Sequence, residues 1–131
     1  TQERVPSNPA FITSATLKKQ ITPERFFYLL MHSNTDVGTV AIERSANEPG
    51  MYFIEKVAIL PEWRHQSLGK ELMRFAEDQI IKAGGSIASV AIIFENTRLK
   101  NWYEQQGYAE NNRKSFDHLP FTVSFLQKRL G

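Results

Sequence analysis

Short apolar runs of strand length dominate the first half of the chain. They cover Arg25–Met31, Thr39–Ser45 and Met51–Leu60, and the segments NTDVG and ANEPG between them are typical of turns. We expect the first two runs to form a hairpin and the third to be a further strand. Ahead of them, Thr13 or Ser14 is suited to cap a short helix that continues to about Ile21.

Helical spacing replaces this pattern after Pro61, which ends the third run. Apolar side chains then recur three and four residues apart until Gly84, at Leu68, Leu72, Phe75, Ala76, Ile80 and Ala83. The next segment, Ser86–Phe94, has almost no polar residue, which favours a central strand that is covered on both faces.

A second helix and two strands close the pattern. Asn96 or Thr97 caps this helix, Gly107 ends it, Tyr108 begins a strand and Pro120–Lys128 alternates as the last strand. The order of elements predicts an α/β fold, a mixed β-sheet with helices on both faces, in one domain over residues 1–131.

The composition limits the classes of partner and of catalytic group that this chain can have. The 131 residues carry a formal net charge of +2 and no long basic run, so no nucleic-acid partner is expected. No apolar run approaches the roughly 20 residues that span a bilayer, so no membrane partner is expected either. Cysteine is absent, which excludes thiolate catalysis and permits a reducing compartment, and we expect a cytoplasmic protein. His32, His65 and His118 are dispersed, so no metal is expected.

A basic loop of little bulk leads into the first long helix. Its residues Arg64, His65, Gln66 and Ser67 are followed by Leu68, Gly69 and Lys70. A helix N-terminus offers unpaired N–H groups and the positive end of the helix dipole. Gly69 lets the backbone approach a ligand, and the charges of Arg64 and Lys70 can neutralise phosphate. The loop therefore suits a pyrophosphate, and a solvated turn is the alternative.

This loop resembles the pyrophosphate loop of the GNAT superfamily of acetyl-CoA-dependent N-acetyltransferases, which reads Arg/Gln-x-x-Gly-x-Gly/Ala. Arg64 and Gly69 match that pattern, and Ser67 replaces its first glycine. A second segment resembles the family's Asn-x-x-Ala-x-x-x-Tyr-x-x-x-Gly-Phe/Tyr element. It matches at Asn96, Tyr103, Gly107 and Tyr108, with Leu99 in place of alanine.

The resemblance covers roughly Arg25 to Lys128 and is to small, single-domain bacterial members. It implies a sheet of about six to seven strands that splays between Met51–Leu60 and Ser86–Phe94. The strand that normally opens the family fold is missing or atypical here.

The resemblance also implies acetyl-CoA as co-substrate and a place for it. The backbone of Val57, Ala58 and Ile59 would hold the pantetheine arm, and the Val57 amide would polarise the thioester carbonyl. As side chains these three are expected to be ordinary core residues. The pyrophosphate would lie on Arg64, His65, Gln66, Ser67, Leu68, Gly69 and Lys70. Asn96 would bind the pantetheine or pin the second splayed strand, or simply cap the helix.

Two residues are candidates for catalysis. A period of two places Glu55 on the strand face of Phe53, Val57 and Ile59, and burial there would raise its pKa toward that of a useful base. The alternative is an exposed or salt-bridged carboxylate. Tyr103 would protonate the leaving thiolate, and a packed core tyrosine is its alternative.

The predicted reaction is direct transfer of an acetyl group to a primary amine in a ternary complex. The alternatives are a non-catalytic coenzyme-binding sensor or assembly module, and a protein that binds another phosphate-rich ligand such as a nucleotide. The acceptor, a small-molecule or peptide amine, is expected near Phe11–Gln20 and Ser115–Phe121, where Glu110 and Asp117 would attract it. A homodimer through the C-terminal edge strand is a further expectation.

Overall fold

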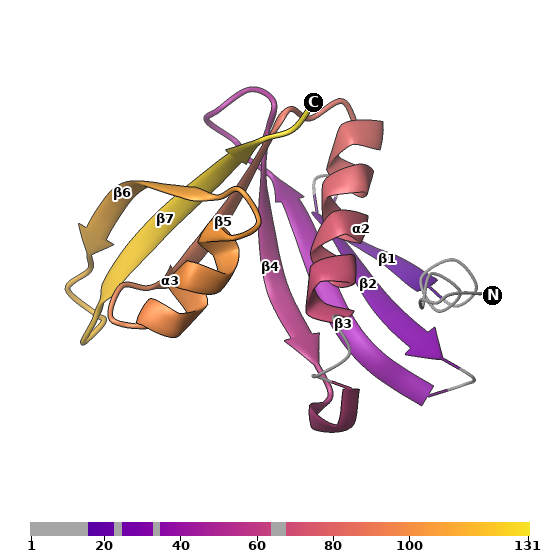
Figure 1. Ribbon diagram of the computed structural model, residues 1–131. Coiled ribbons are helices and arrows are strands. Elements are labelled where there is room, and N and C mark those ends of the chain that lie inside the picture. The colour runs from indigo at the N-terminus through magenta and orange to yellow at the C-terminus, as the bar shows by residue number, and fades with distance from the viewer. Residues whose placement is uncertain (1–15, 23–24, 33–34, 64–67) are drawn as a thin grey trace.

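Seven strands form one mixed sheet in the order β1-β2-β3-β4-β5-β7-β6. The structure is a computed structural model that describes residues 16–22, 25–32, 35–63 and 68–131 (Figure 1). The strands are β1 (Thr16–Thr22), β2 (Arg25–His32), β3 (Thr35–Arg44), β4 (Met51–Ile59), β5 (Ile87–Ile93), β6 (Ala109–Ser115) and β7 (Thr122–Arg129). The helices are a short 3-10 turn, η1 (Pro61–Trp63), and the α-helices α2 (Leu68–Lys82) and α3 (Thr97–Glu104).

The pairing of the strands confirms the predicted mixed α/β fold. Strands β1 to β4 form an antiparallel meander, β4 pairs with β5 in parallel, and β7 pairs antiparallel with both β5 and β6. The parallel pair needs a crossover, and α2 supplies it.

Two expectations about the first strands are wrong. The segment predicted as a helix up to Ile21 is β1 from Thr16 onward, and its backbone pairs along β2 from Thr16↔Leu30 to Thr22↔Arg25. The unpaired edge of β2 provides hydrogen-bonding groups along its whole length, which outweighs a weak local helix signal. The predicted turn NTDVG is also shorter, because β3 already begins at Thr35.

The sheet divides into two arms that diverge like the sides of a V (Figure 1). Strands β4 and β5 pair only where Met51–Phe53 lies beside Ile87–Ser89, and beyond that point they separate. We call β1 to β4 with α2 the first arm, and β5, β6 and β7 with α3 the second arm. This parting confirms the splay that the family resemblance implied.

One hydrophobic core lies under the two α-helices. The first arm contributes buried side chains from β2, β3 and β4, on which α2 packs, as Tyr28 does edge-on against Phe75 with ring centroids 5.0 Å apart. The second arm contributes its inward positions Ala88, Val90, Ile92 and Leu126. Among the described residues, both α-helices lie on this face. Helices had been expected on both faces, and the described part of the chain has them on one.

The run Ser86–Phe94 is central in the sheet, as its apolar composition predicted. It is not covered on both faces, because Ala91 is exposed and 43% of Ile93 is accessible. These two side chains point to the face opposite the helices, where β5 has already parted from β4.

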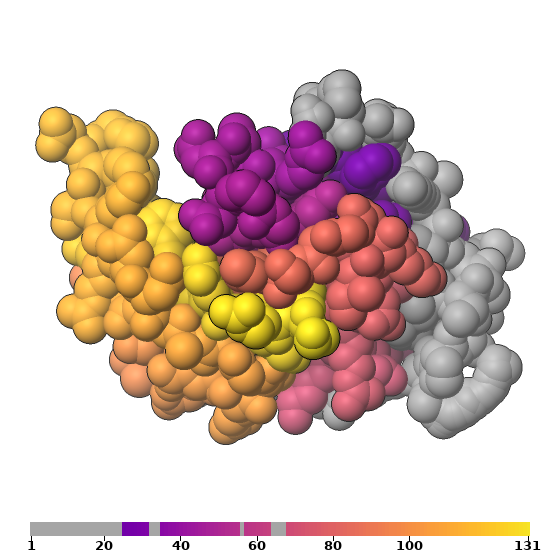
Figure 2. All heavy atoms as spheres, turned by 90° about the horizontal axis from the view of Figure 1, so that it is seen from above, coloured from indigo at the N-terminus to yellow at the C-terminus, as the bar shows by residue number. Residues whose placement is uncertain are grey.

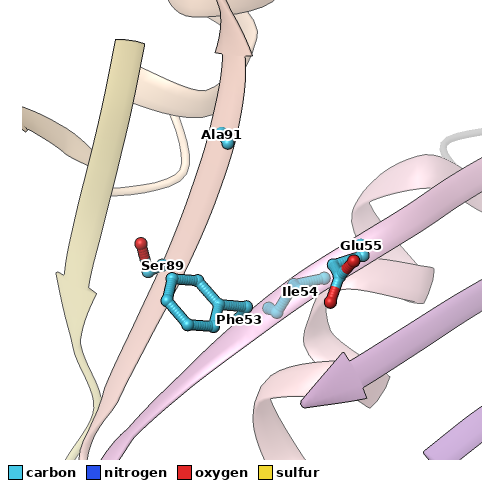
Figure 3. Close-up of a pocket in the computed structure, with 5 residues that line it drawn as sticks. All are labelled: Phe53, Ile54, Glu55, Ser89 and Ala91. Carbon is cyan, nitrogen blue, oxygen red and sulfur yellow. The ribbon is translucent and has the colours of Figure 1, made fainter. Parts of the chain in front are cut away.

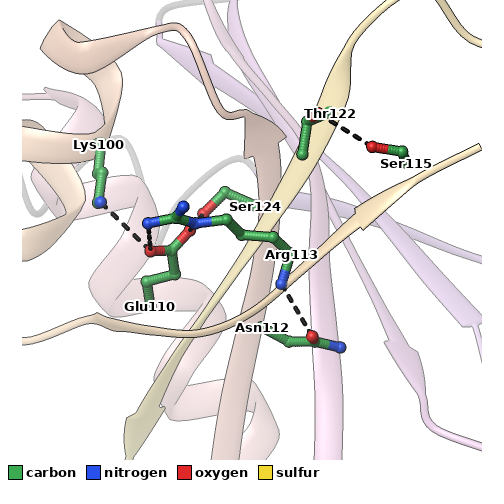
Figure 4. A network of polar contacts seen from close by, with 7 residues as sticks. All are labelled: Lys100, Glu110, Asn112, Arg113, Ser115, Thr122 and Ser124. Atoms are coloured by element: carbon green, nitrogen blue, oxygen red, sulfur yellow. Dashed lines mark hydrogen bonds and ion pairs between the residues drawn. The ribbon is translucent and has the colours of Figure 1, made fainter.

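A network of charged groups ties α3 to the two strands at the edge of the second arm (Figure 4). Glu110 accepts hydrogen bonds from Ser124 and from the Arg113 guanidinium, with Arg113 Nε 2.9 Å from Oε2. The ammonium of Lys100 on α3 lies 3.4 Å from the other oxygen. Hydrogen bonds from Arg113 and Ser124 lower the pKa of Glu110 from 4.5 to about 2. Glu110 is thus already paired within the chain, and its attraction for an amine acceptor stays a prediction.

We expect Glu110→Gln to lower the thermal midpoint at pH 7. The native pKa of Glu110 is depressed, so the carboxylate stabilises the fold above its ordinary pKa and this contribution fades as the pH falls from 4.5 to about 2. Melting curves of wild type and variant should therefore differ at pH 7 and converge toward pH 2. Glu104→Gln on the exposed side of α3 is the control. A difference in thermal midpoint between wild type and Glu110→Gln that stays constant with pH would show that the lowered pKa of Glu110 is not its cause.

Candidate functional site

An open cavity of about 400 Å³ lies where β4 and β5 part (Figure 3). Phe53, Ile54 and Glu55 line it from the first arm, and Ser89 and Ala91 from the second. The cavity therefore opens between the arms at the point where strand pairing ends, which leaves backbone and side chains of both arms accessible from one space.

A β-bulge in β4 sets which side chains face this cavity. The register with β3 passes from Ala41↔Glu55 to Thr39↔Ala58, so one residue of β3 lies opposite two of β4. After the bulge Val57 and Ile59 pack against the helix-covered core, whereas Glu55 stays on the cavity face with Phe53. The predicted common face of Glu55, Val57 and Ile59 is therefore wrong, since strict alternation fails at a bulge.

The three backbone candidates for the pantetheine arm differ in exposure. Val57 and Ile59 are half-buried against the core, as expected of their side chains. Ala58 is exposed and is not a core residue, because its pairing with Thr39 places it on the opposite face of the strand.

Glu55 forms a salt bridge at the cavity with an arginine from β2, which lies two strands away from β4 in the sheet. Its Oε1 lies 3.7 Å from Nη2 of Arg25 on β2, and 36% of its side chain is accessible. The expected burial is thus only partial, and the salt-bridged alternative from the sequence is also realised. The carboxylate therefore borders the cavity as one partner of an ion pair.

Tyr103 is a buried residue of α3 between two other aromatic rings. Its ring makes edge contacts with Trp102 and Tyr108, at centroid distances of 4.9 and 5.7 Å, and only 6% of the residue is accessible. Burial raises the pKa of Tyr103, so the hydroxyl keeps its proton well beyond neutral pH. It can therefore donate a proton. Tyr103 lies in the helix-covered core and is not among the residues that line the cavity beside Glu55.

The N-terminus of α2 lies at the end of β4 beyond the cavity. Leu68 is 1% accessible, Lys70 is exposed, and Gly69 lies against the indole of Trp102 from α3. The predicted loop residues Arg64, His65, Gln66 and Ser67 lie outside the described residues.

Helix packing gives a reason for glycine at position 69 that could not be inferred from the sequence. A Cβ there would lie 3.0 Å from Cζ2 of Trp102, which is closer than ordinary van der Waals contact. Gly69 therefore allows α2 and α3 to approach, in addition to any approach of a ligand that the sequence suggested.

We expect Gly69→Ala to destabilise the wild-type protein although alanine is the better helix former. In a Trp102→Leu background the crowding is relieved, and the same change should stabilise by up to about 1 kcal/mol. Urea unfolding of the four proteins in this cycle measures the reversal. Stabilisation by alanine in both backgrounds would show that the indole contact does not require glycine.

Asn96 is the N-cap of α3, as one alternative from the sequence predicted. Its Oδ1 accepts a hydrogen bond from the backbone N–H of Leu99 at 3.0 Å. Asn96 also follows closely on the end of β5 at Ile93. A role toward the coenzyme stays a prediction.

Several residues of the site were not anticipated from the sequence. Phe53 and Ser89 line the cavity, and Arg25 holds Glu55. Ser89 gave one usable signal, since it is a polar residue within an almost wholly apolar strand. His118 is exposed, and its ring lies 5.8 Å from that of Phe116.

The described residues contain neither a metal centre nor a membrane-spanning helix. In residues 16–22, 25–32, 35–63 and 68–131, no three His, Cys, Asp or Glu side chains gather where they could hold a metal ion. In the same ranges no helix is long and apolar enough to cross a membrane.

The chain is similar to known acetyltransferases in sequence and in fold. It is 29% identical over 91 residues to an uncharacterised N-acetyltransferase in the pepI 3′ region of Lactobacillus delbrueckii subsp. lactis. That match covers 66% of this chain, and the chain spans only 53% of that relative.

Solved structures share the fold. A GNAT family acetyltransferase from Elizabethkingia anophelis with acetyl-CoA bound has a TM-score of 0.73 at 16% identity, over 82% of this chain and 77% of its own. The ribosomal-protein-S18-alanine N-acetyltransferase from Escherichia coli has a TM-score of 0.69 at 13% identity, and the match covers 83% of this chain and 71% of that one. A family model described as the acetyltransferase (GNAT) family matches residues 2–108. This chain, with its parted strands and the cavity between them, belongs to the acetyltransferase (GNAT) family.

Proposed function

We propose that the protein is an N-acetyltransferase that moves the acetyl group of acetyl-CoA to a primary amine. The observation that carries this proposal is the parting of β4 from β5 after Phe53 and Ser89, with a cavity of about 400 Å³ at that point. A parted strand pair can accept an extended arm in place of the missing strand neighbour.

The residues present suit the parts of the coenzyme. The backbone at Val57, in the bulge of β4 and beyond its last pair with β5, would offer amide groups to a pantetheine arm and to a thioester oxygen. The N-terminus of α2, with Lys70 exposed beside it, suits a pyrophosphate. The family resemblance adds Arg64, Ser67 and their neighbours to that end of the site.

Residues on the two sides of the gap between β4 and β5 would carry out the two proton transfers that the reaction needs. Glu55, on the open side, takes a proton from the attacking amine, directly or through a water molecule. The nitrogen–carbon bond forms and the carbon–sulfur bond breaks, and Tyr103 on the helix-covered side gives a proton to the leaving sulfur. The chain has no cysteine, so an acyl-cysteine intermediate plays no part.

The acceptor would reach Glu55 from the open face of the sheet. Phe53 forms an apolar wall beside the carboxylate, and an amine with an apolar body would satisfy both groups. A small amine and the amine of a peptide both meet this description.

A steady-state assay tests the proposal. Acetyl-CoA is incubated with a panel of amines that includes amino acids, polyamines, amino-sugars and short peptides, and thiol release is followed with acetylated product by mass spectrometry. Saturable acetylation of one class supports the enzyme. Coenzyme binding without acetylation of any amine would instead support the sensor, and neither binding nor turnover would contradict both.

A further inference from the structure

Three polar side chains, of which Glu77 and Tyr108 are buried and Lys128 is partly exposed, join the two arms on the helix-covered face. Glu77 on α2, only 8% accessible, accepts a 2.7 Å hydrogen bond from the hydroxyl of Tyr108. The ammonium of Lys128 on β7 donates to both carboxylate oxygens, at 3.1 and 3.2 Å. We call these three residues the clasp, because Glu77 belongs to the first arm and the other two to the second.

The clasp lies where strand pairing does little to fix the angle between the arms. Helix α2 packs on β3 and β4 of the first arm, and the arms share strand pairs only along Met51–Phe53. Figure 2, which looks onto the closed end of the V, shows the C-terminal end of the chain in yellow lying beside α2. Contacts between α2 and the second arm therefore bridge the two arms where strand pairing is absent.

Two such contacts are spaced along α2. Gly69 meets Trp102 at the N-terminal end, and Glu77 meets Tyr108 and Lys128 eight residues later, which is about 12 Å along a helix. The first contact is apolar and allows sliding. The clasp is directional, because hydrogen bonds to a buried carboxylate lose energy steeply when their geometry changes.

The polar groups of the clasp satisfy one another. Burial raises the pKa of Tyr108 far above its ordinary value, and the hydrogen bond to Glu77 raises it further, so the phenol remains a donor. Lys128 neutralises the carboxylate and also lies 5.7 Å from the centroid of the Tyr108 ring. Removal of one partner would leave a buried charge poorly compensated, which weakens the whole bridge.

The clasp also bears on the candidate acid. The ring of Tyr108, fixed by its hydroxyl at one end, packs edge-on against Tyr103 at 5.7 Å. One set of contacts therefore fixes both the separation of the arms and one wall around Tyr103.

We propose that Glu77, Tyr108 and Lys128 are positioning residues that set the width of the gap in which the pantetheine arm lies. This inference rests on the proposed function, because the gap matters only if the coenzyme enters it. None of the three touches the reacting atoms. Their effect reaches the reaction through the distance between β4 and β5.

The test compares a ligand that enters the gap with one that does not. Tyr108→Phe keeps the ring and removes the hydrogen bond to Glu77. Calorimetric titration should show affinity for coenzyme A lowered about tenfold, the scale of a typical coupling energy. Affinity for 3′-phospho-ADP, the nucleotide portion alone, should stay unchanged. Equal affinities of wild type and variant for coenzyme A would overturn the proposal.

Matched variants separate gap width from general stability. Tyr28→Phe removes the hydroxyl of another buried tyrosine, one that packs on Phe75 within the first arm, and it should leave both affinities unchanged. Lys128→Met and Glu77→Gln should reproduce the selective loss. If Tyr28→Phe weakens coenzyme binding as much as Tyr108→Phe does, the effect is stability alone and the clasp is refuted.

A distance measurement keeps the two proposals distinguishable. The chain has no cysteine, so cysteines introduced at the exposed residues Asp78 and Lys114 accept spin labels on opposite arms. Tyr108→Phe should broaden the distance distribution between the labels, whether or not a coenzyme binds. An unchanged distribution overturns the clasp. Failure of the wild type to bind coenzyme A overturns the proposed function and leaves the distance result to decide on the clasp.

Discussion

Replacement of Glu55 by glutamine is expected to lower the turnover number for amine acetylation at neutral pH by a hundredfold or more. This is the usual contribution of a general base, because an amine is mostly protonated near pH 7 and cannot attack until it loses that proton. Glutamine preserves the shape of the side chain, so affinity for acetyl-CoA should not change. The rate of the variant should approach that of the wild type at high pH, where the acceptor deprotonates in solution.

Glu43→Gln is the control for the salt bridge. Glu43 shares Arg25 with Glu55, at 3.9 Å from Nε, yet it does not line the cavity of about 400 Å³. Loss of its charge changes the environment of Arg25 without removing the proposed base. Comparable losses of turnover in both variants would show that Arg25, and not proton abstraction by Glu55, explains the effect.

Tyr103→Phe is expected to lower turnover by about a hundredfold with little change in the Michaelis constant for acetyl-CoA. Phenylalanine keeps the edge contacts with Trp102 and Tyr108, so only the donated proton is lost. A thiolate is a fair leaving group, which places the effect at the lower end of the range for acid catalysis. Pre-steady-state measurement of thiol release isolates this step from binding.

The pH profile gives a second test of Tyr103. Burial raises its pKa above 10, so an acid in this place stays protonated and the alkaline fall of the turnover number should lie above that pH. Tyr52→Phe, at a buried tyrosine near the closed end of the V, is the control. A Tyr103→Phe enzyme that turns over like Tyr52→Phe would support a packed core tyrosine without a chemical role.

The sequence predicted those parts of the fold that depend on local pattern. Asn96 caps α3 because an amide oxygen satisfies the N–H of Leu99, and that preference is visible in one segment. Likewise the apolar spacing after Leu68 and the glycines at its end defined α2 to within a residue or two. Such signals need no knowledge of the partner elements.

Features that depend on partners could not be predicted. The bulge between Glu55 and Ala58 arises from pairing with β3, and it moved Val57 and Ile59 to the other face. The edge of β2 drew the segment from Thr16 into a strand. Both are tertiary effects that override local periodicity.

Likewise, only some residues of the site could be predicted from the sequence. Glu55 and Tyr103 came from motif and periodicity, whereas Arg25 lies 30 residues before Glu55 and its contact follows only from the order of the strands. Tyr108 matched the family pattern, but its bond to Glu77 joins residues 31 positions apart. Long-range polar contacts of this kind leave no periodic trace.

Titration of the wild-type protein with acetyl-CoA by isothermal calorimetry, with ATP as the comparison ligand, tests whether the parted strands hold a coenzyme site. We expect one site with a dissociation constant on the order of micromolar and no measurable competition by ATP. The pantetheine arm, which ATP lacks, would then supply the selectivity that the parted strands imply. Absence of binding, or equal displacement by ATP, would contradict a coenzyme site between β4 and β5.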